Sequence, residues 1–570
     1  MIKISYYLLY SLSYVSSLFQ KESAESKGKK KKLSVLRNVP ADWHIPQSCI
    51  PISGKSNILA VATNPEVGIL SEKEIDITES YSVDELLECI HSRQLTALEV
   101  TIAFCKRAAI ANQLTNCCTE LMFADSIERA KYLDEYMETN GKPIGPLHGL
   151  PVSLKDSFKV PGYDSTIGFT INIGNATSEF SNLPKLLYEQ GCVFYVKSNI
   201  PQFLMTCDSD NVIFGKVLNP MNTSLTAGGS SGGEGSMIKQ YGSIIGIGTD
   251  IGGSIRIPAI CCGIYGFKPS CDRFPYGNQL KPNDLRDDQG FGLKCSAGPM
   301  SNKLSNIEFM FRAMLATKPW TIDADVKPIA FQESLYKEGS SKEVLTIGYF
   351  IEDESFPLHP PMKRSMLASV EKLKKEGHNL VLIKPYSLKA TWRHCTRSYM
   401  QDMGFYTALR IIKVGELPIP SFGTTSVESF GLPPANLTSG MLSSFLKERA
   451  TIAEFWSQVF IEHKLDVLLC PGAPHGAVKH DTYGIAPYTG VWNAVDYPAL
   501  IIPLINEKPL TLENAPPVEE YVKGDGSFAI ADYKPEELVG SVTHVQLVCK
   551  NFADEKLLGC AKIIDNVLNS

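Results

Sequence analysis

Residues 226–269 read TAGGSSGGEGSMIKQYGSIIGIGTDIGGSIRIPAICCGIYGFKP, and glycine is concentrated there. Twelve of the 43 glycines fall in the 39 residues from Gly228 to Gly266. Such density permits positive φ angles, allows close approach to a ligand or another backbone, or loosens a linker. The apolar runs 244–247 and 255–260 are not typical of a linker. The cluster therefore indicates a loop that exposes backbone groups.

Two nucleotide-binding interpretations of this cluster fit poorly. A phosphate-binding loop needs the pattern GxxxxGK[ST], and the cluster has no lysine at the required place. Residues 246–252 come close to a dinucleotide-binding fingerprint after an apolar run, but the glycine spacing differs. A serine nucleophile has more support, because Ser230, Ser231 and Ser254 each lie beside glycine pairs. Backbone N–H groups in such loops can converge on an oxyanion.

The residues leave two choices of base for a serine nucleophile. Residues 229–233 match GxSxG, which requires a strand before the serine and a histidine later in the chain. The residues before it are not strand-like, and of the ten histidines only His544 lies beyond His480. The surrounding VTHVQLV favours a strand histidine, and His148 is also expected to be structural. The other choice is a lysine base, which acts only when neutral.

Lys155 is the candidate for that base. In PLHGLPVSLKDSFKVPGY (146–163), Val152 and Leu154 alternate with polar residues between prolines and glycines, which predicts a short strand ending at Lys155. Apolar neighbours would bury the amine, and burial lowers a lysine pKa by up to ~3–5 units from about 10.4.

Periodicity elsewhere predicts alternating helices and strands. Residues 83–107 have helical spacing, with Thr96 as a cap before residues 97–106. Further helices are expected at 183–190 and 362–376, and strands at 192–197, 243–247, 344–350, 380–383 and 467–470. No internal repeat or strong linker follows Leu70. The pattern predicts an α/β fold, with one large domain over residues 36–570 and a mixed sheet between helical layers.

Composition narrows the class of protein. The chain has 570 residues, 20% of them charged, and a formal net charge of −6. This balance is typical of a soluble globular protein and argues against nucleic-acid binding by bulk charge. The fifteen cysteines are an odd number with irregular spacing, which makes a poor disulfide framework and favours a reducing compartment. We therefore expect a cytoplasmic protein.

Residues 1–35 differ from the rest of the chain. An apolar run from Ile4 to Phe19 is interrupted by serines and falls short of the roughly 20 residues of a membrane span. Lysines 27 and 29–32 then indicate a solvated tether. We expect a poorly ordered extension, and membrane contact by the apolar run is the less favoured interpretation.

The sequence resembles the amidase signature family of serine hydrolases, with fungal acetamidases the most similar group. GGSSGG (228–233) and GTDIGGSIR (248–256) match the family motifs almost letter for letter, and LHGLPVSLKD (147–156) resembles the motif that carries the family's lysine. The similarity extends over residues 36–570 and implies the amidase signature fold. The departures are Cys549, where glycine is frequent, and Ser541, where a proline is common nearby.

The resemblance implies a role for each matching residue. Ser254 would be the nucleophile, Lys155 the base, and Ser230, after a cis peptide bond, the proton relay between them. The N–H groups of Ile251, Gly252, Gly253 and Ser254 would form the oxyanion hole. Hydrogen bonds of four residues would brace these loops: Ser231, Thr249, Asp250 and Arg256.

The implied activity is hydrolysis of a monocarboxylic acid amide to the acid and ammonia, on small aliphatic amides such as acetamide, with no metal or organic cofactor. The partner is then a small-molecule amide; a homodimer is compatible with the sequence. Three alternatives stay open: a fatty-acid amide hydrolase-like enzyme, an amidotransferase-type subunit and a catalytically silent binding relative. The Glu234-Gly235 continuation argues against the amidotransferase, and intact Lys155, Ser230 and Ser254 argue against the silent relative.

Overall fold

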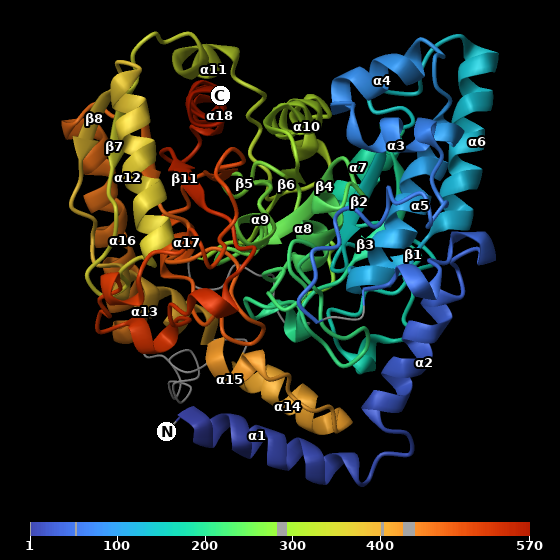
Figure 1. The fold of residues 1–570 in the computed structure, drawn as a ribbon, viewed down its shortest axis with the longest axis horizontal. Coiled ribbons are helices and arrows are strands. Elements are labelled where there is room, and N and C mark those ends of the chain that lie inside the picture. Colours follow the sequence, from blue (N-terminus) through green and yellow to red (C-terminus); the bar gives the residue numbers. More distant parts are fainter. Residues whose placement is uncertain (1, 52–53, 282–292, 401–403, 426–438) are drawn as a thin grey trace.

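The computed structural model describes residues 2–51, 54–281, 293–400, 404–425 and 439–570. Within these residues, eleven strands form one mixed sheet (Figure 1). The strand order is β1-β3-β2-β4-β6-β5-β10-β11-β9-β7-β8. The strands are β1 (Cys118–Leu121), β2 (Pro151–Lys155), β3 (Val193–Ser198), β4 (Gly246–Asp250), β5 (Tyr265–Lys268), β6 (Ser296–Ser301), β7 (Thr346–Tyr349), β8 (Asn379–Leu382), β9 (Val467–Cys470), β10 (Ala499–Pro503) and β11 (His544–Val548).

Strand direction brings two predicted site segments to one edge of the sheet. β2 pairs in parallel with both β3 and β4, whereas β4 pairs antiparallel with β6. Parallel neighbours end at the same edge of a sheet. Lys155, the last residue of β2, therefore lies beside Thr249 and Asp250 at the end of β4.

Helices cover the sheet and form the flanks of the molecule (Figure 1). Helix α8 packs against β2, β3, β4 and β6, and α9 packs against β5 and β10. The α-helices are α1 (Ile2–Ser17), α2 (Ala24–Leu36), α3 (Glu72–Glu79), α4 (Val83–His91), α5 (Ala97–Thr115), α6 (Phe123–Asn140), α7 (Asn182–Glu189), α8 (Gly232–Lys239), α9 (Arg256–Cys262), α10 (Leu304–Ala316), α11 (Glu333–Ser340), α12 (Pro360–Lys375), α13 (Leu388–Met400), α14 (Gly404–Val414), α15 (Ser421–Thr425), α16 (Ser439–Glu462), α17 (Pro487–Ala494) and α18 (Asp554–Leu568).

Most elements predicted from periodicity are confirmed. Thr96 caps α5: its side chain accepts from the Glu99 N–H, and the Glu99 carboxylate accepts in return from the Thr96 N–H. The strand expected at 467–470 is β9, and the strand expected to end at Lys155 is β2. The strand expected at 243–247 instead occupies Gly246–Asp250, because its antiparallel pairing with β6 runs over those five residues.

The amino-terminal segment differs from the expected poorly ordered extension. Residues 2–17 and 24–36 are helices α1 and α2, and the predicted tether is part of α2. Lys31 forms ion pairs with Glu120 and with Asp164, the latter at 2.9 Å, and Lys32 donates to the Phe214 carbonyl at 2.7 Å. The sequence alone indicates that Lys31 and Lys32 are solvated. In the structure, both lysines instead bind residues far along the chain.

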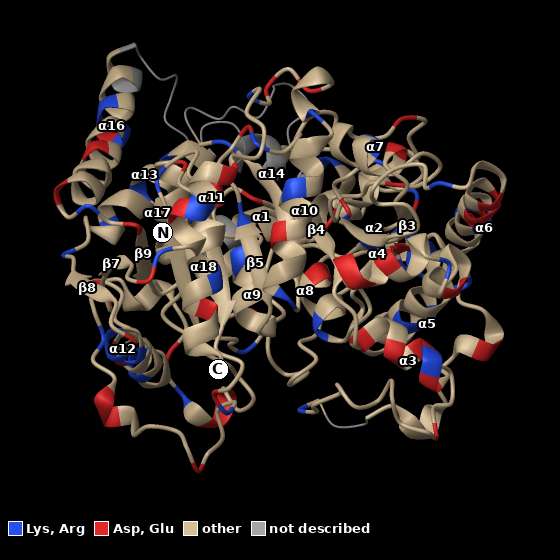
Figure 2. Cartoon of the chain, turned by 90° about the horizontal axis from the view of Figure 1, so that it is seen from above, with Lys and Arg blue, Asp and Glu red and all other residues tan. Residues whose placement is uncertain are grey.

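Charge and thiol distribution agree with the composition. Figure 2 shows Lys and Arg interspersed with Asp and Glu over the described chain. All fifteen cysteines are free thiols, most of them buried. Within the described ranges, no helix is both long and apolar enough to cross a bilayer.

The Lys31 ion pairs provide a test of how firmly α2 is held. Lys31→Met leaves two buried carboxylates without their cation, so the free energy of unfolding should fall by about 2–4 kcal/mol. Lys30→Met is the matched control, because Lys30 is 74% exposed and pairs only with Glu22 at the surface; its cost should stay under about 1 kcal/mol. Urea unfolding of both variants measures the difference, and equal midpoints would contradict the tight docking of α2.

Candidate active site

Lys155 lies at the centre of the site. Its side chain is fully buried at the end of β2. The Nζ donates to Ser230 Oγ at 2.7 Å, to Thr249 Oγ1 at 2.8 Å and to the Thr249 carbonyl at 3.3 Å. The structure therefore joins Lys155 to one of the predicted serines across 75 residues of sequence.

Burial sets the protonation of this lysine. Desolvation lowers the pKa of Lys155 to about 7, although the nearby carboxylates of Asp250, Glu234 and Asp156 oppose that shift. A substantial fraction of the amine is consequently neutral near pH 7. The apolar sequence around Lys155 predicted a lowered pKa for its amine, and the structure agrees with that direction.

Ser230 is held by the first glycine-rich loop. The peptide bond between Gly229 and Ser230 is cis, as the family resemblance implies. Ser230 is almost completely buried. A side chain at Gly229 would collide with the Thr206 carbonyl, so this position has room only for glycine. The loop thereby holds the Ser230 hydroxyl against Lys155.

Ser254 lies on the second loop, just before α9, and is half-buried. Its carbonyl accepts from the Ser231 N–H at 3.1 Å, which ties the two serine-bearing loops together. This bond uses the Ser231 backbone, so a bracing role of its side chain stays a prediction. A hydrogen bond between the Ser230 and Ser254 side chains stays a prediction.

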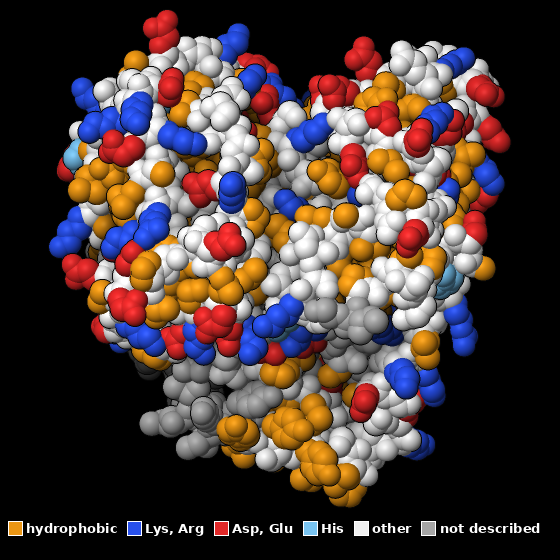
Figure 3. All heavy atoms as spheres, in the orientation of Figure 1, with side chains coloured by type: hydrophobic (Ala, Val, Ile, Leu, Met, Phe, Trp, Pro, Cys, Tyr) orange, Lys and Arg blue, Asp and Glu red, His pale blue; other side chains and the backbone are white. Residues whose placement is uncertain are grey.

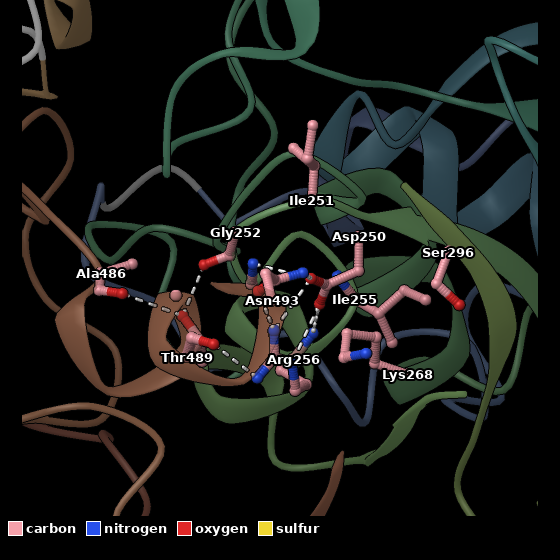
Figure 4. A network of polar contacts seen from close by, with 12 residues as sticks. Asp250, Ile251, Gly252, Ile255, Arg256, Lys268, Ser296, Ala486, Thr489 and Asn493 are labelled. Atoms are coloured by element: carbon pink, nitrogen blue, oxygen red, sulfur yellow. Dashed lines mark hydrogen bonds and ion pairs between the residues drawn. The ribbon is translucent and has the colours of Figure 1, made fainter. Parts of the chain in front are cut away.

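The carbonyl groups of the second loop are fixed by distant side chains. Tyr399 donates to the Ile251 carbonyl at 2.8 Å, and Thr489 Oγ1 donates to the Gly252 carbonyl at 2.7 Å. Figure 4 shows Thr489 reaching Gly252 from α17. Fixing a carbonyl also fixes the peptide plane and hence the direction of the following N–H.

Gly253 differs from the expectation for the oxyanion hole. Its N–H donates to Asp250 Oδ1 at 2.8 Å, so in this structure it braces the loop. Its φ is +136°, a backbone conformation that side chains disfavour, and a Cβ there would collide with Thr489. The predicted oxyanion donors thus reduce to Ile251, Gly252 and Ser254.

Asp250 and Arg256 form a fully buried ion pair below this loop (Figure 4). Arg256 Nε and Nη2 donate to the two carboxylate oxygens at 3.0 and 2.9 Å. Burial alone would raise the pKa of Asp250, but Arg256 holds that pKa well below its ordinary range. Asn493 adds a donor to Asp250 Oδ1 at 3.0 Å. Asp250 and Arg256, two of the residues predicted to brace the loops, are therefore bound to each other.

His544 does not have the geometry of a catalytic base. It starts β11, is buried, and its Nε2 accepts from the Gly472 N–H at 3.1 Å. Burial lowers the pKa of His544 to about 3. His148 also accepts a backbone N–H, from Ile144 at 3.1 Å. Both histidines are structural, as expected.

Sequence reasoning missed several residues that shape the site. Tyr399, Thr489 and Asn493 lie more than 140 residues after the loop that they contact, and no local pattern marks them. Glu234 was noted only as part of a motif. Its buried carboxylate accepts from Ser153 Oγ at 2.5 Å, and burial raises the pKa of Glu234 to about 7.

Comparison with known proteins defines the class of protein. The profile of the amidase family matches residues 99–558. A Gibberella moniliformis protein named amidase is 34% identical, with 93% of this chain and 96% of that protein aligned. An Aspergillus oryzae protein named acetamidase is 32% identical over 94% and 97% of the two chains. The solved structure of a fatty acid amide hydrolase superposes with a TM-score of 0.86 at 26% identity, covering 98% of this chain and 96% of that one.

These matches agree with the site geometry. The chain is an amide hydrolase with the α/β architecture that was predicted. It belongs to the amidase signature family. Within the described ranges, no group of three or more His, Cys, Asp or Glu side chains is arranged to hold a metal ion.

The Thr489 contact can be tested without disturbing the reacting groups. Thr489→Val keeps the shape of the side chain but removes the bond to the Gly252 carbonyl. The loop then loses one restraint, and we expect kcat to fall about 10- to 100-fold with little change in KM, since each tenfold corresponds to about 1.4 kcal/mol. Thr451→Val is the control, because Thr451 is an exposed residue of α16. A loss confined to KM would contradict a loop-positioning role.

Proposed function

We propose that the protein hydrolyses a carboxylic acid amide through a relay of Lys155, Ser230 and Ser254. The hydrogen bond of 2.7 Å between a buried lysine of pKa about 7 and Ser230 is the observation that carries the proposal. A serine hydroxyl needs a base, and this lysine is the buried base next to it.

The reaction begins with activation of Ser254. Neutral Lys155 accepts the proton of Ser230 as Ser230 accepts the proton of Ser254. Ser254 Oγ then bonds to the amide carbon. The negative charge moves to the carbonyl oxygen, where the N–H groups of Ile251, Gly252 and Ser254 stabilise it. Such preorganised donors contribute several kcal/mol to transition-state stabilisation.

The intermediate then collapses to an acyl-enzyme. The relay returns its proton to the amide nitrogen, the carbon–nitrogen bond breaks and ammonia leaves. A water molecule, deprotonated through the same relay, attacks the ester on Ser254 and releases the carboxylic acid. The net reaction consumes one amide and one water and produces one acid and one ammonia. The site residues are regenerated and supply all the proton transfers.

Two variants distinguish the lysine relay from a histidine base. Lys155→Ala should reduce kcat/KM by at least about 10³-fold because no base remains, whereas His544→Ala should keep most of the activity. Thermal unfolding of both variants checks that they fold. A fluorophosphonate probe should label Ser254. The reverse order of activities, or labelling of Ser231, would overturn the relay.

The same relay predicts a pH dependence. The base acts only as the neutral amine, so kcat/KM of the wild-type enzyme should rise with pH and reach half its maximum near the pKa of Lys155, about 7.

For the substrate, we propose small aliphatic primary amides. Support comes from relatives named acetamidase that align over nearly their whole length. The high structural similarity to a fatty acid amide hydrolase favours long-chain amides as the second candidate.

Hydrolysis rates for acetamide, benzamide and a long-chain acyl amide separate these candidates. We expect the highest kcat/KM for acetamide, because two relatives at 32% and 31% identity are named acetamidase. Lys155→Ala with each amide is the control for background hydrolysis. A preference of tenfold or more for the long-chain amide would favour the second candidate and leave the relay unaffected.

A further inference from the structure

Helix α1 lies along the foot of the molecule in Figure 1 and packs against α14 and α15. Its packed face consists largely of serines. Ser13 is fully buried, and Ser16 and Ser17 are half-buried. The Ser17 backbone approaches Gly415 so closely that a Cβ on Gly415 would lie 2.5 Å from the Ser17 Cα. Small side chains thus let α1 dock tightly.

The opposite face of α1 is apolar and exposed. Leu8, Leu12 and Val15 repeat at helical spacing and are 57%, 46% and 53% exposed, and Phe19, just beyond the end of the helix, is 83% exposed. Together with the neighbouring Tyr14 and Leu18, they form what we call the α1 stripe. Figure 3 shows apolar side chains gathered over this part of the molecule. The usual polarity of a surface helix is therefore reversed.

Charges near the α1 stripe have one sign in excess. Residues 4–20 contain no Asp, Glu, Lys or Arg, whereas residues 21–32 contain six lysines and two glutamates. Of these lysines, Lys31 and Lys32 bind partners within the fold and Lys30 pairs with Glu22. Lys21 and Lys29 are exposed, as is Lys413 at the end of α14. The Gln20 side chain donates to the Lys413 carbonyl at 3.2 Å, so Lys21 and Lys413 lie near the carboxyl end of α1, and Lys29 lies in the helix that follows, α2.

The dimensions of the α1 stripe favour a lipid surface over a protein partner. Sixteen helical residues span about 24 Å, and one face of such a helix offers a few hundred Å². A stable protein interface buries about 800 Å² on each partner. A bilayer sets no such minimum, and an apolar helix face beside lysines is what anionic headgroups bind.

We propose that the α1 stripe, with Lys21 and Lys29, docks the protein peripherally on an anionic lipid surface. The helix lies in the plane of the headgroups. The hydroxyl of Tyr14 stays at the level of water and headgroups while the leucines and Phe19 enter the acyl region. This inference goes beyond the proposed reaction and does not depend on it.

Co-sedimentation of the full-length protein with vesicles tests the proposal. Wild-type protein should bind to vesicles of phosphatidylcholine mixed with phosphatidylserine. It should bind more weakly to vesicles of phosphatidylcholine alone. Leu12→Glu with Val15→Glu should reduce binding at least about tenfold, since two apolar anchors become anionic. Lys21→Glu with Lys29→Glu should reduce the preference for phosphatidylserine at least about fivefold.

Matched variants control for folding and for general hydrophobicity. Val522→Glu with Phe528→Glu changes two residues that are 74% and 64% exposed outside the α1 stripe, so binding should stay at the wild-type level. Leu18→Glu with Phe19→Glu changes two residues beyond the last helical residue of α1. This variant should reduce vesicle binding without unfolding α1. Hydrolysis of a small water-soluble amide should be unchanged in all of these variants.

Three results would overturn the proposal. Wild-type protein that binds neither vesicle type has no lipid-docking surface. Variants of the α1 stripe that bind as well as the wild type place lipid binding elsewhere. Light scattering that shows a lipid-free dimer, dissociated by Leu12→Glu with Val15→Glu, assigns the α1 stripe to a second copy of the chain.

Discussion

The buried ion pair between Asp250 and Arg256 is the interaction on which the site depends. Burying two charges costs several kcal/mol for each, and the cost is offset only where every hydrogen-bonding group has a partner. All five N–H groups of Arg256 have one: two bind Asp250, and the others bind Thr489, Asn493 and Gln546. The pair thus connects the glycine-rich loop to helix α17 and strand β11, far along the chain.

This network gives the glycines of the second loop a mechanical role. The Asp250 carboxylate accepts from the N–H of Gly253 and of Ile255, while Thr489 and Tyr399 hold the loop's carbonyls from outside. Hydrogen bonds therefore restrain both the N–H groups and the carbonyls of the loop. Oxyanion stabilisation requires such a preorganised backbone. Lys155 depends on a related balance. Burial makes its amine a base near neutral pH, and the carboxylates around it limit how far its pKa falls.

Periodicity predicted most helices and strands, because their apolar residues face one continuous core. The capping box at Thr96 and the strand ending at Lys155 are examples. However, it placed β4, which carries Thr249 and Asp250, three residues too early. The lysine run in residues 27–32 predicted a solvated tether, whereas Lys31 and Lys32 bind partners within the fold. Glu120 and Asp164, which pair with Lys31, lie on distant segments that no local pattern connects to α2. The prediction for Gly253 differed because the direction of an N–H depends on backbone torsion angles, which residue types do not specify.

The sequence by itself indicated the family and the candidate reacting groups. A lysine after LHGLPVSL and serines in two glycine-rich motifs are a combination specific enough to identify an amide hydrolase. Only the tertiary structure decided that Lys155 is buried against Ser230, that Gly253 braces its loop, and that Tyr399, Thr489 and Asn493 support the site. The physical reason is that desolvation and hydrogen-bond direction arise from neighbours in space, and here those neighbours include residues 75 to 243 positions apart in the sequence.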